Sequence, residues 1–150
     1  MVKKSFVHYL TKYLVDFLFY SGIICTLTVP FLIKPAVEYY GYNSNLSVFF
    51  GVILFLSGLS AVYILWQLKV IFKTLLSGSP FIQRNVNALR KMAVASSIIA
   101  VIFIVKCITF FTIASGLIVI VFSLASLFCL TLKDVFKEAV YYKEETDLTI

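Results

Sequence analysis

The chain has 150 residues, of which 61% are hydrophobic and 13% are charged, and its formal net charge is +6. Soluble domains carry about 25% charged residues, so this composition excludes an ordinary water-soluble globular domain. The charges are also segregated, because Lys106 is the only one between Met92 and Leu132. The continuous apolar surface therefore needs a bilayer to cover it.

Four apolar stretches account for this composition, at residues 13–32, 47–65, 92–111 and 113–132. Each is close to the ~20 residues that a helix needs to cross a bilayer. We therefore predict an all-α fold, a polytopic four-helix transmembrane bundle with cytoplasmic helical extensions. It forms a single membrane domain over residues 1–150, with a cytoplasmic segment at 66–91 and a cytoplasmic tail at 133–150.

The first stretch follows Lys3 and Lys4 and so resembles a secretory signal peptide. Its apolar run is longer than the roughly 7–15-residue core of such a peptide, and no A-x-A-like cleavage site follows. We predict a retained helix instead. Pro30 and Pro35 are expected to mark its end, because proline limits helix continuation. Residues 33–46 then form the outer loop.

Asp16 and Lys106 are the two charges inside the predicted spans, and such charges are functional hypotheses by default. For Asp16 we prefer structural pairing with Lys12 or with a basic residue between the second and third spans. Lys106 lies toward the outer end of the third span, where it snorkels outward or meets Glu38. Neither is a midplane carboxylate, which argues against ion-coupled transport.

The second stretch carries small residues that favour close helix packing. Gly51 and Gly58 are accompanied by Ser57 and Ser60. This spacing lets the helix approach a neighbour closely, either within the bundle or in a second copy of the chain, so a homo-oligomer remains open.

The second helix is expected to continue past Leu65 with an amphipathic pattern as far as Leu76. A helix from Ser47 to Leu76 is about 45 Å long at 1.5 Å per residue, which exceeds the bilayer core. It either projects into the cytoplasm or bends along anionic lipid headgroups. Gly78 ends it, and Ser79 and Pro80 are predicted to be the N-cap and first-turn proline of the next helix.

The third and fourth stretches are joined without charge or proline, which predicts a tight turn near residues 110–115 and an antiparallel hairpin. Beyond the fourth span, residues 133–145 continue as an amphipathic helix that ends in acidic residues. We hypothesise that this tail packs against the middle segment. Its acidic residues would lie near the basic ones there, pairing Glu144, Glu145 or Asp147 with Arg84, Arg90 or Lys91.

The distribution of basic residues predicts the orientation of the bundle in the membrane, because Lys and Arg near span ends favour the cytoplasm. Eleven of the thirteen Lys and Arg residues fall on one side of the predicted topology, the exceptions being Lys34 and Lys106. The chain is therefore predicted to be a multi-pass protein of the bacterial cytoplasmic membrane with both termini cytoplasmic.

No motif in the chain carries catalytic or metal chemistry. The three cysteines, Cys25, Cys107 and Cys129, have neither metal-ligand spacing nor a disulfide pattern. No H-E-x-x-H, P-loop, G-x-S-x-G or paired-carboxylate site is present. We expect no enzymatic activity, no cofactor and no direct contact with nucleic acid.

Two segments resemble a family of small bacterial four-span membrane proteins, the domain-of-unknown-function 2975 family. The resemblance rests on Pro80-Phe81, Asn85-Val86 and Leu89-Arg90, and on the ending Asp147-Leu148-Thr149-Ile150. It implies an inner-membrane protein without established catalytic activity. Members are often encoded beside a small helix-turn-helix regulator, which implies a membrane partner of a transcription factor.

The interpretation that follows is a regulatory or docking protein whose cytoplasmic face binds a soluble partner, with anionic lipid as a further partner. The candidate docking residues are Pro80, Phe81, Arg84, Asn85, Arg90, Lys91, Phe136, Glu144, Glu145 and Asp147. The alternative is a small transporter or peptide-immunity protein that binds a hydrophobic ligand within the bundle. That alternative predicts a polar cavity between the spans.

Overall fold

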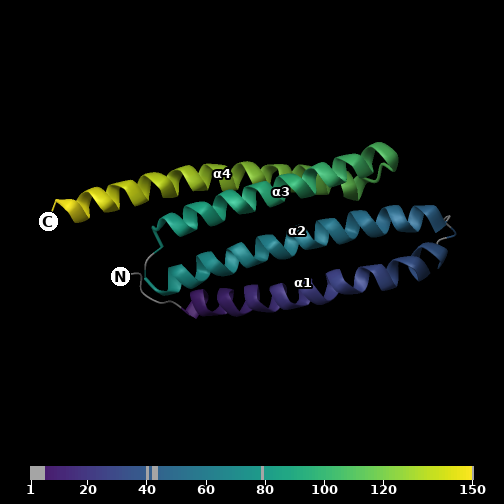
Figure 1. The fold of residues 1–150 in the computed structure, drawn as a ribbon, viewed down its shortest axis with the longest axis horizontal. Coiled ribbons are helices and arrows are strands. Elements are labelled where there is room, and N and C mark those ends of the chain that lie inside the picture. The colour runs from purple at the N-terminus through teal and green to yellow at the C-terminus, as the bar shows by residue number, and fades with distance from the viewer. Residues whose placement is uncertain (1–5, 40, 42–43, 79, 150) are drawn as a thin grey trace.

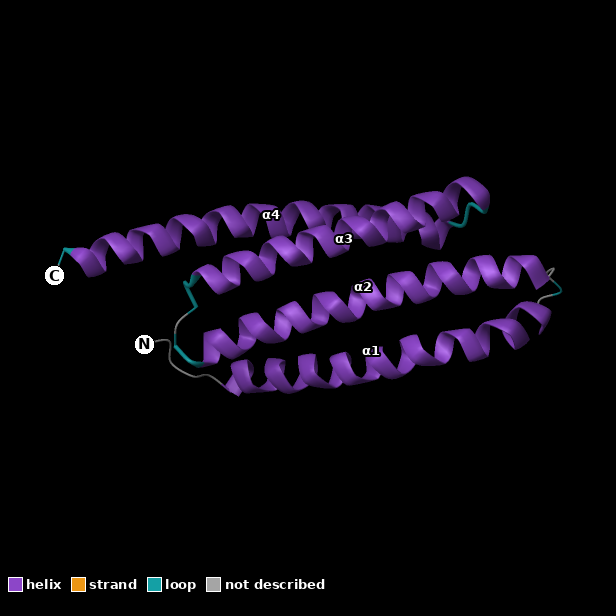
Figure 2. Cartoon of the chain, viewed as in Figure 1, coloured by secondary structure: helices purple, strands orange, loops and turns teal. Residues whose placement is uncertain are grey.

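The computed structural model describes residues 6–39, 41, 44–78 and 80–149, and these form four long helices (Figure 1). The helices are α1 (Phe6–Tyr39), α2 (Ser44–Leu76), α3 (Gln83–Thr109) and α4 (Ile113–Leu148). Only short connections separate them (Figure 2). All four are long and apolar enough to cross a membrane, which confirms the predicted four-span, all-α architecture. Lys3, Lys4, Ser79 and Ile150 lie outside the described residues.

The four helices lie side by side in chain order, as an open row rather than a closed ring (Figure 1). Each helix packs against the next. Among the described residues, no Cα atom of α1 lies within 8 Å of α3 or α4, and none of α2 lies within 8 Å of α4. The most enclosed helix is α3, whose buried residues run from Asn85 to Phe103. The remaining apolar surface is left for lipid.

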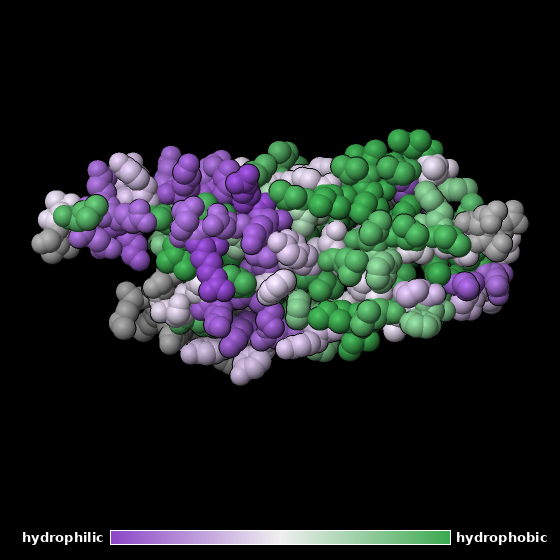
Figure 3. Space-filling view, in the orientation of Figure 1, coloured by the Kyte–Doolittle hydropathy of each residue, from purple (hydrophilic) through white to green (hydrophobic). Residues whose placement is uncertain are grey.

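The helices are longer than the hydrocarbon core of a bilayer. With 27 to 36 residues each, they measure about 40–54 Å at 1.5 Å per residue, against a core of about 30 Å. One end of the row, where α4 finishes, is hydrophilic, and most of the visible surface beyond it is hydrophobic (Figure 3). We call this the basic end. Its described basic residues are Lys12, Lys69, Lys73, Arg84, Arg90, Lys91, Lys133, Lys137 and Lys143.

The helix α1 continues through both of its prolines, so the expectation that Pro30 and Pro35 end it is wrong. Each proline frees one backbone carbonyl, but unwinding the chain in lipid would expose several more. The helix α1 also contacts α2 on both sides of Pro30, through Thr26 and Ile33. The connection between α1 and α2 is correspondingly shorter than predicted. It contains Gly41, which has a φ of 71° and donates its N–H to the Glu38 carbonyl at 3.0 Å.

The glycines of α2 let it approach α1 closely. A Cβ on Gly58 would lie 2.8 Å from Thr26 Oγ1, and a Cβ on Gly51 would lie 3.3 Å from Ile33 Cγ2. The predicted close approach is confirmed, and the neighbour is α1 of the same chain. These glycines therefore need no second copy to explain them.

The junction between α2 and α3 is only partly as predicted. The second helix does continue to Leu76, and Gly78 follows it with a φ of 84°, a value that favours glycine. The third helix begins at Gln83, not at Pro80, and its N-cap is Ile82. Pro80 precedes the helix, and its carbonyl accepts a hydrogen bond from the Asn85 side chain at 2.6 Å. That bond links Pro80 to the first turn of α3.

The predicted hairpin of α3 and α4 is confirmed, with residues 110–112 as its turn. Thr112 caps α4, and its N–H donates to Ser115 Oγ at 3.2 Å. Lys106 Nζ donates to Thr112 Oγ1 at 2.8 Å, so the ammonium reaches outward to the turn as predicted, with Thr112 rather than Glu38 as its partner. The predicted tail helix is also confirmed, because α4 runs without interruption to Leu148.

Candidate functional site at the basic end

A buried amide joins the end of α2 to the start of α3. Asn85 is fully buried, and its Oδ1 accepts a hydrogen bond from Thr74 Oγ1 at 2.8 Å. Its Nδ2 donates to the Pro80 carbonyl at 2.6 Å, and its backbone N–H donates to the Ile82 carbonyl at 2.9 Å. Asn85 therefore has a structural role, because it links the end of α2 to the segment that precedes α3. It is not available to a soluble partner, which removes it from the predicted docking residues.

The other predicted docking residues are accessible but lie in separate places. Phe81, Arg84, Arg90, Lys91 and the three acidic tail residues are exposed, whereas Pro80 and Phe136 are half-buried. Arg84 lines a cleft of about 450 Å³ that also contains residues of α1 and α2. Arg90 and Lys91 line a different groove, between α2 and α3. Arg84 and the pair of Arg90 and Lys91 thus line two different hollows of the surface.

The base of the α4 tail packs on the segment that precedes α3. The rings of Phe81 and Phe136 lie 5.4 Å apart between centroids, and Val140 is 6% exposed. The predicted association of the tail with the middle segment is thus confirmed as an apolar contact. Such contacts supply more stability than exposed ion pairs do.

The predicted ion pairs between the acidic tail and the middle segment are wrong. Among the described residues, ion pairs join Lys69 to Asp16 and Lys133 to Asp134. The two helices are antiparallel, so beyond Phe136 the tail runs away from α3. Glu144 lies about 12 Å farther along α4 than Phe136, and the end of α4 projects past the start of α3 (Figure 1). Residues 141–149 are all exposed.

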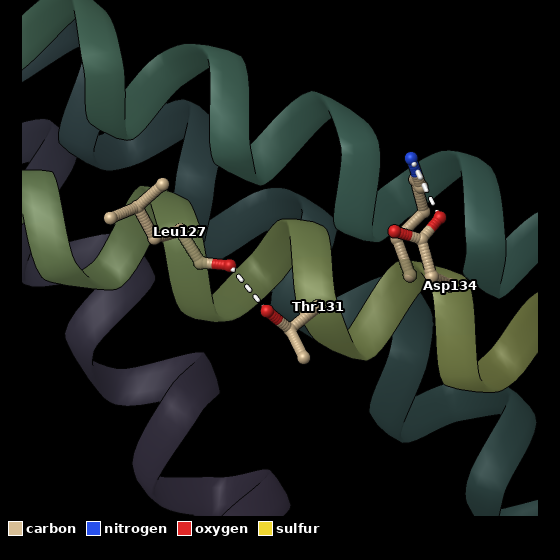
Figure 4. Close-up of polar contacts among 4 residues, drawn as sticks. Leu127, Thr131 and Asp134 are labelled. Carbon is tan, nitrogen blue, oxygen red and sulfur yellow. Dashed lines mark hydrogen bonds and ion pairs between the residues drawn. The ribbon is translucent and has the colours of Figure 1, made fainter.

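Where α4 approaches the basic end, its polar groups are satisfied within the helix (Figure 4). Thr131 Oγ1 donates to the Leu127 carbonyl at 3.1 Å, and Lys133 Nζ lies 3.0 Å from Asp134 Oδ1. A threonine that bonds to its own helix presents little unmet polarity to lipid. This part of α4 can therefore pass through the membrane–water interface. The exposed polar side chains that a partner could bind lie in the tail beyond it.

Asp16 pairs with Lys69 across α1 and α2, at 2.9 Å. Lys69 is one of the basic residues predicted between the second and third spans, so this interpretation is confirmed. The ammonium also lies 4.7 Å from the Phe19 ring centroid and 5.0 Å from that of Tyr20. The pair is a structural link between two helices.

Two interhelical features were not predicted from the sequence. Ser126 Oγ on α4 donates to the Ala93 carbonyl on α3 at 3.0 Å and lies 2.7 Å from Ser97 Oγ. The second feature is a groove of about 570 Å³ between α2 and α3, whose polar lining includes Tyr63 and Asn87. For the contacts of Ser126, the sequence did contain a signal, because α3 has a run of small residues that favours close approach of a neighbouring helix. The groove is open to the surface and lined mostly by apolar atoms, so it is not the polar cavity that the ligand-binding alternative predicts.

Among the residues that the structure describes, no group of three or more His, Cys, Asp or Glu is placed to hold a metal ion. Neither the curated proteins nor the solved structures contain a significant match to the chain. One family model does match, that of a protein of unknown function, DUF2975, and it covers residues 12–150. This range contains α2, α3, α4, nearly all of α1 and both segments that carried the resemblance. The chain is an integral membrane protein of four candidate spans, and it belongs to the DUF2975 family.

Proposed function

We propose that this protein is a non-enzymatic docking protein of the bacterial cytoplasmic membrane, and that it holds a soluble protein through the projecting end of α4. The observation that carries the proposal is the exposure of residues 141–149 on a helix that extends beyond its neighbours. A membrane anchor alone has no need of an ordered helix that projects beyond its neighbours.

The tail presents one amphipathic face. Tyr141 and Leu148 are seven residues apart and so lie on the same side of the helix, where they are 62% and 88% exposed. Glu144 and Glu145 stand between them at the third and fourth positions. We call these four residues the tail face. The apolar anchors stand at i and i+7, two of the positions through which a helix docks into an apolar groove, and the two glutamates between them add negative charge to the same face.

The tail face calls for a partner with an apolar groove and a basic rim. A small helix-turn-helix transcription regulator has a basic surface for DNA, and relatives of this family are often encoded beside one. Binding of the tail face to that surface would compete with DNA, so the membrane protein would hold the regulator inactive. The protein itself would not contact nucleic acid.

The cytoplasmic placement of the basic end rests on the distribution of charge. Nine described Lys and Arg residues lie at that end, and Lys34 and Lys106 lie toward the other. Basic residues near span ends favour the cytoplasm, so we infer that the start of α1 and the end of α4 lie where a soluble regulator can reach them.

The test takes any small helix-turn-helix regulator encoded beside the gene of this chain and measures its binding to the full protein in phosphatidylcholine nanodiscs by biolayer interferometry. We expect Tyr141→Ala combined with Leu148→Ala to weaken binding tenfold or more, since buried aromatic and aliphatic anchors dominate such interfaces. The matched control is Leu117→Ala combined with Leu124→Ala. These are also seven residues apart on α4 and similarly exposed, but lie within the span.

The control should bind within twofold of the unmodified protein. Glu144→Gln combined with Glu145→Gln should slow association and reduce its dependence on salt. Equal binding by the Tyr141/Leu148 variant and the unmodified protein would refute the assignment of the tail face. Absence of regulator binding to the unmodified protein would refute the proposed partner.

A further inference from the structure

The groove between α2 and α3 changes character along its length. Arg90 and Lys91 line it toward the basic end, and Val94 and Ile98 line it farther into the span. Ile98 is eight residues beyond Arg90, which is about 12 Å along the helix. The groove therefore runs from cationic groups at headgroup level into an apolar channel. Its volume of about 570 Å³ is that of a small-molecule site.

The two cations of the groove lack compensation within the chain. Neither Arg90 nor Lys91 forms an ion pair with any residue that the structure describes, in contrast to Lys69 and Lys133. Both side chains are exposed and line the same groove, so an anion bound there would have two cations within reach. Phosphate suits the forked guanidinium of an arginine.

Hydrogen-bonding groups from both helices lie beside these cations. Tyr63 comes from α2 and Asn87 from α3, and no described residue hydrogen-bonds to either side chain. The Tyr63 ring rests edge-on against Trp66, with centroids 6.2 Å apart, which holds it at the groove wall. The donors around the head of the groove thus come from two elements that already pack together.

We propose that this groove binds one anionic phospholipid from the leaflet at the basic end. The lipid phosphate lies between Arg90 and Lys91, and an acyl chain follows the apolar channel past Val94 toward Ile98. Basic pockets between transmembrane helices are known recognition sites for anionic headgroups. A soluble anion would satisfy the cations but not the apolar channel, which lies within a candidate membrane span. This site is separate from the tail face.

The experiment uses the full chain, purified in dodecyl maltoside and analysed by native mass spectrometry. Phosphatidylglycerol and phosphatidylcholine with the same acyl chains are titrated separately. We expect one phosphatidylglycerol to bind at least tenfold more tightly than phosphatidylcholine. Glycerophosphoglycerol, which has the headgroup without acyl chains, should not displace it at equal concentration. Displacement by this headgroup would instead assign the site to a soluble phosphodiester and overturn the proposal.

Two pairs of variants separate the groove from general charge and packing. Arg90→Gln with Lys91→Gln should reduce phosphatidylglycerol binding to the phosphatidylcholine level. Lys137→Gln with Lys143→Gln removes the same charge from the same end and should leave it within twofold.

The apolar channel has its own pair of variants. Val94→Trp should fill the channel and abolish the lipid preference, whereas Val121→Trp, which lies on α4 outside the groove and is similarly exposed, should preserve it. Because Val94 points outward, its replacement leaves the packed core intact and keeps the test open if the charge variant fails to fold. Equal affinity for the two lipids, or equal effects within either pair of variants, would overturn the proposal.

Discussion

Replacing Asn85 tests the junction between α2 and α3 most directly. In Asn85→Ala the Pro80 carbonyl loses a hydrogen bond of 2.6 Å, and Thr74 loses one of 2.8 Å. Thr74 Oγ1 also lies 2.8 Å from the Ile71 carbonyl, so its hydroxyl keeps a partner. The cost is thus one unsatisfied carbonyl, at about 1–3 kcal/mol, and one lost hydrogen bond, at about 1 kcal/mol. We expect the free energy of unfolding to fall by about 2–4 kcal/mol.

The assay is unfolding by SDS in dodecyl maltoside micelles, followed by far-UV circular dichroism. Asn87→Ala is the matched control, because it makes the same chemical change two residues later at an exposed position. It should alter stability by no more than about 0.5 kcal/mol. If Asn85→Ala were no more destabilising than Asn87→Ala, the hydrogen bonds of the Asn85 amide would not stabilise the junction between α2 and α3.

Two further predictions concern the contact of α1 with α2. Gly58→Leu should destabilise the protein by about 1–3 kcal/mol, because its Cβ would lie 2.8 Å from Thr26 Oγ1. Gly116→Ala, whose Cβ would lie no closer than 3.8 Å to a neighbour, should not destabilise it in the same SDS assay. In a double-mutant cycle of Asp16→Asn and Lys69→Gln, the half-exposed ion pair should show a coupling of up to about 1 kcal/mol that falls as salt rises. A coupling of zero at low salt would mean that the pair does not link the helices.

The sequence predicted the helices well because hydrophobic length and charge are local signals. The end of α2 before Gly78 and the turn at residues 110–112 were predictable for the same reason, because helix termination and turns depend on neighbouring residues. Asp16 was predictable in part, since a charge near a span end needs a partner, but the sequence left the choice open between Lys12 and the basic residues between the second and third spans. Each of these inferences needed no knowledge of which helix faces which.

The misses all depended on tertiary packing. Proline ends a helix in isolation, but Pro30 lies between two contacts with α2 that keep the helix intact. Asn85 looked like a surface residue because amides usually are, and only the direction of the chain after Gly78 turns it inward onto Thr74. The ion pairs predicted for Glu144 do not form, because α4 is antiparallel to α3 and extends away from it beyond Phe136. Complementary charge in the sequence does not indicate this separation in space.

The open row also bears on whether the chain needs a second copy. The helix α1 has one neighbour, and its far side carries large exposed side chains at heptad spacing, among them Tyr13, Phe17, Tyr20 and Ile24. In water such a stripe would demand a partner, but lipid tails are as apolar as these side chains and cover them without cost. Close association of membrane helices needs small residues, and the small residues Gly51 and Gly58 of the neighbouring helix are already occupied by α1. Nothing in the packing of α1 therefore calls for a dimer. The polar and charged features that suggest a function lie instead around the start of α3. They are the hydrogen bonds of Asn85, the proposed lipid groove and the contact between Phe81 and Phe136 at the base of the tail.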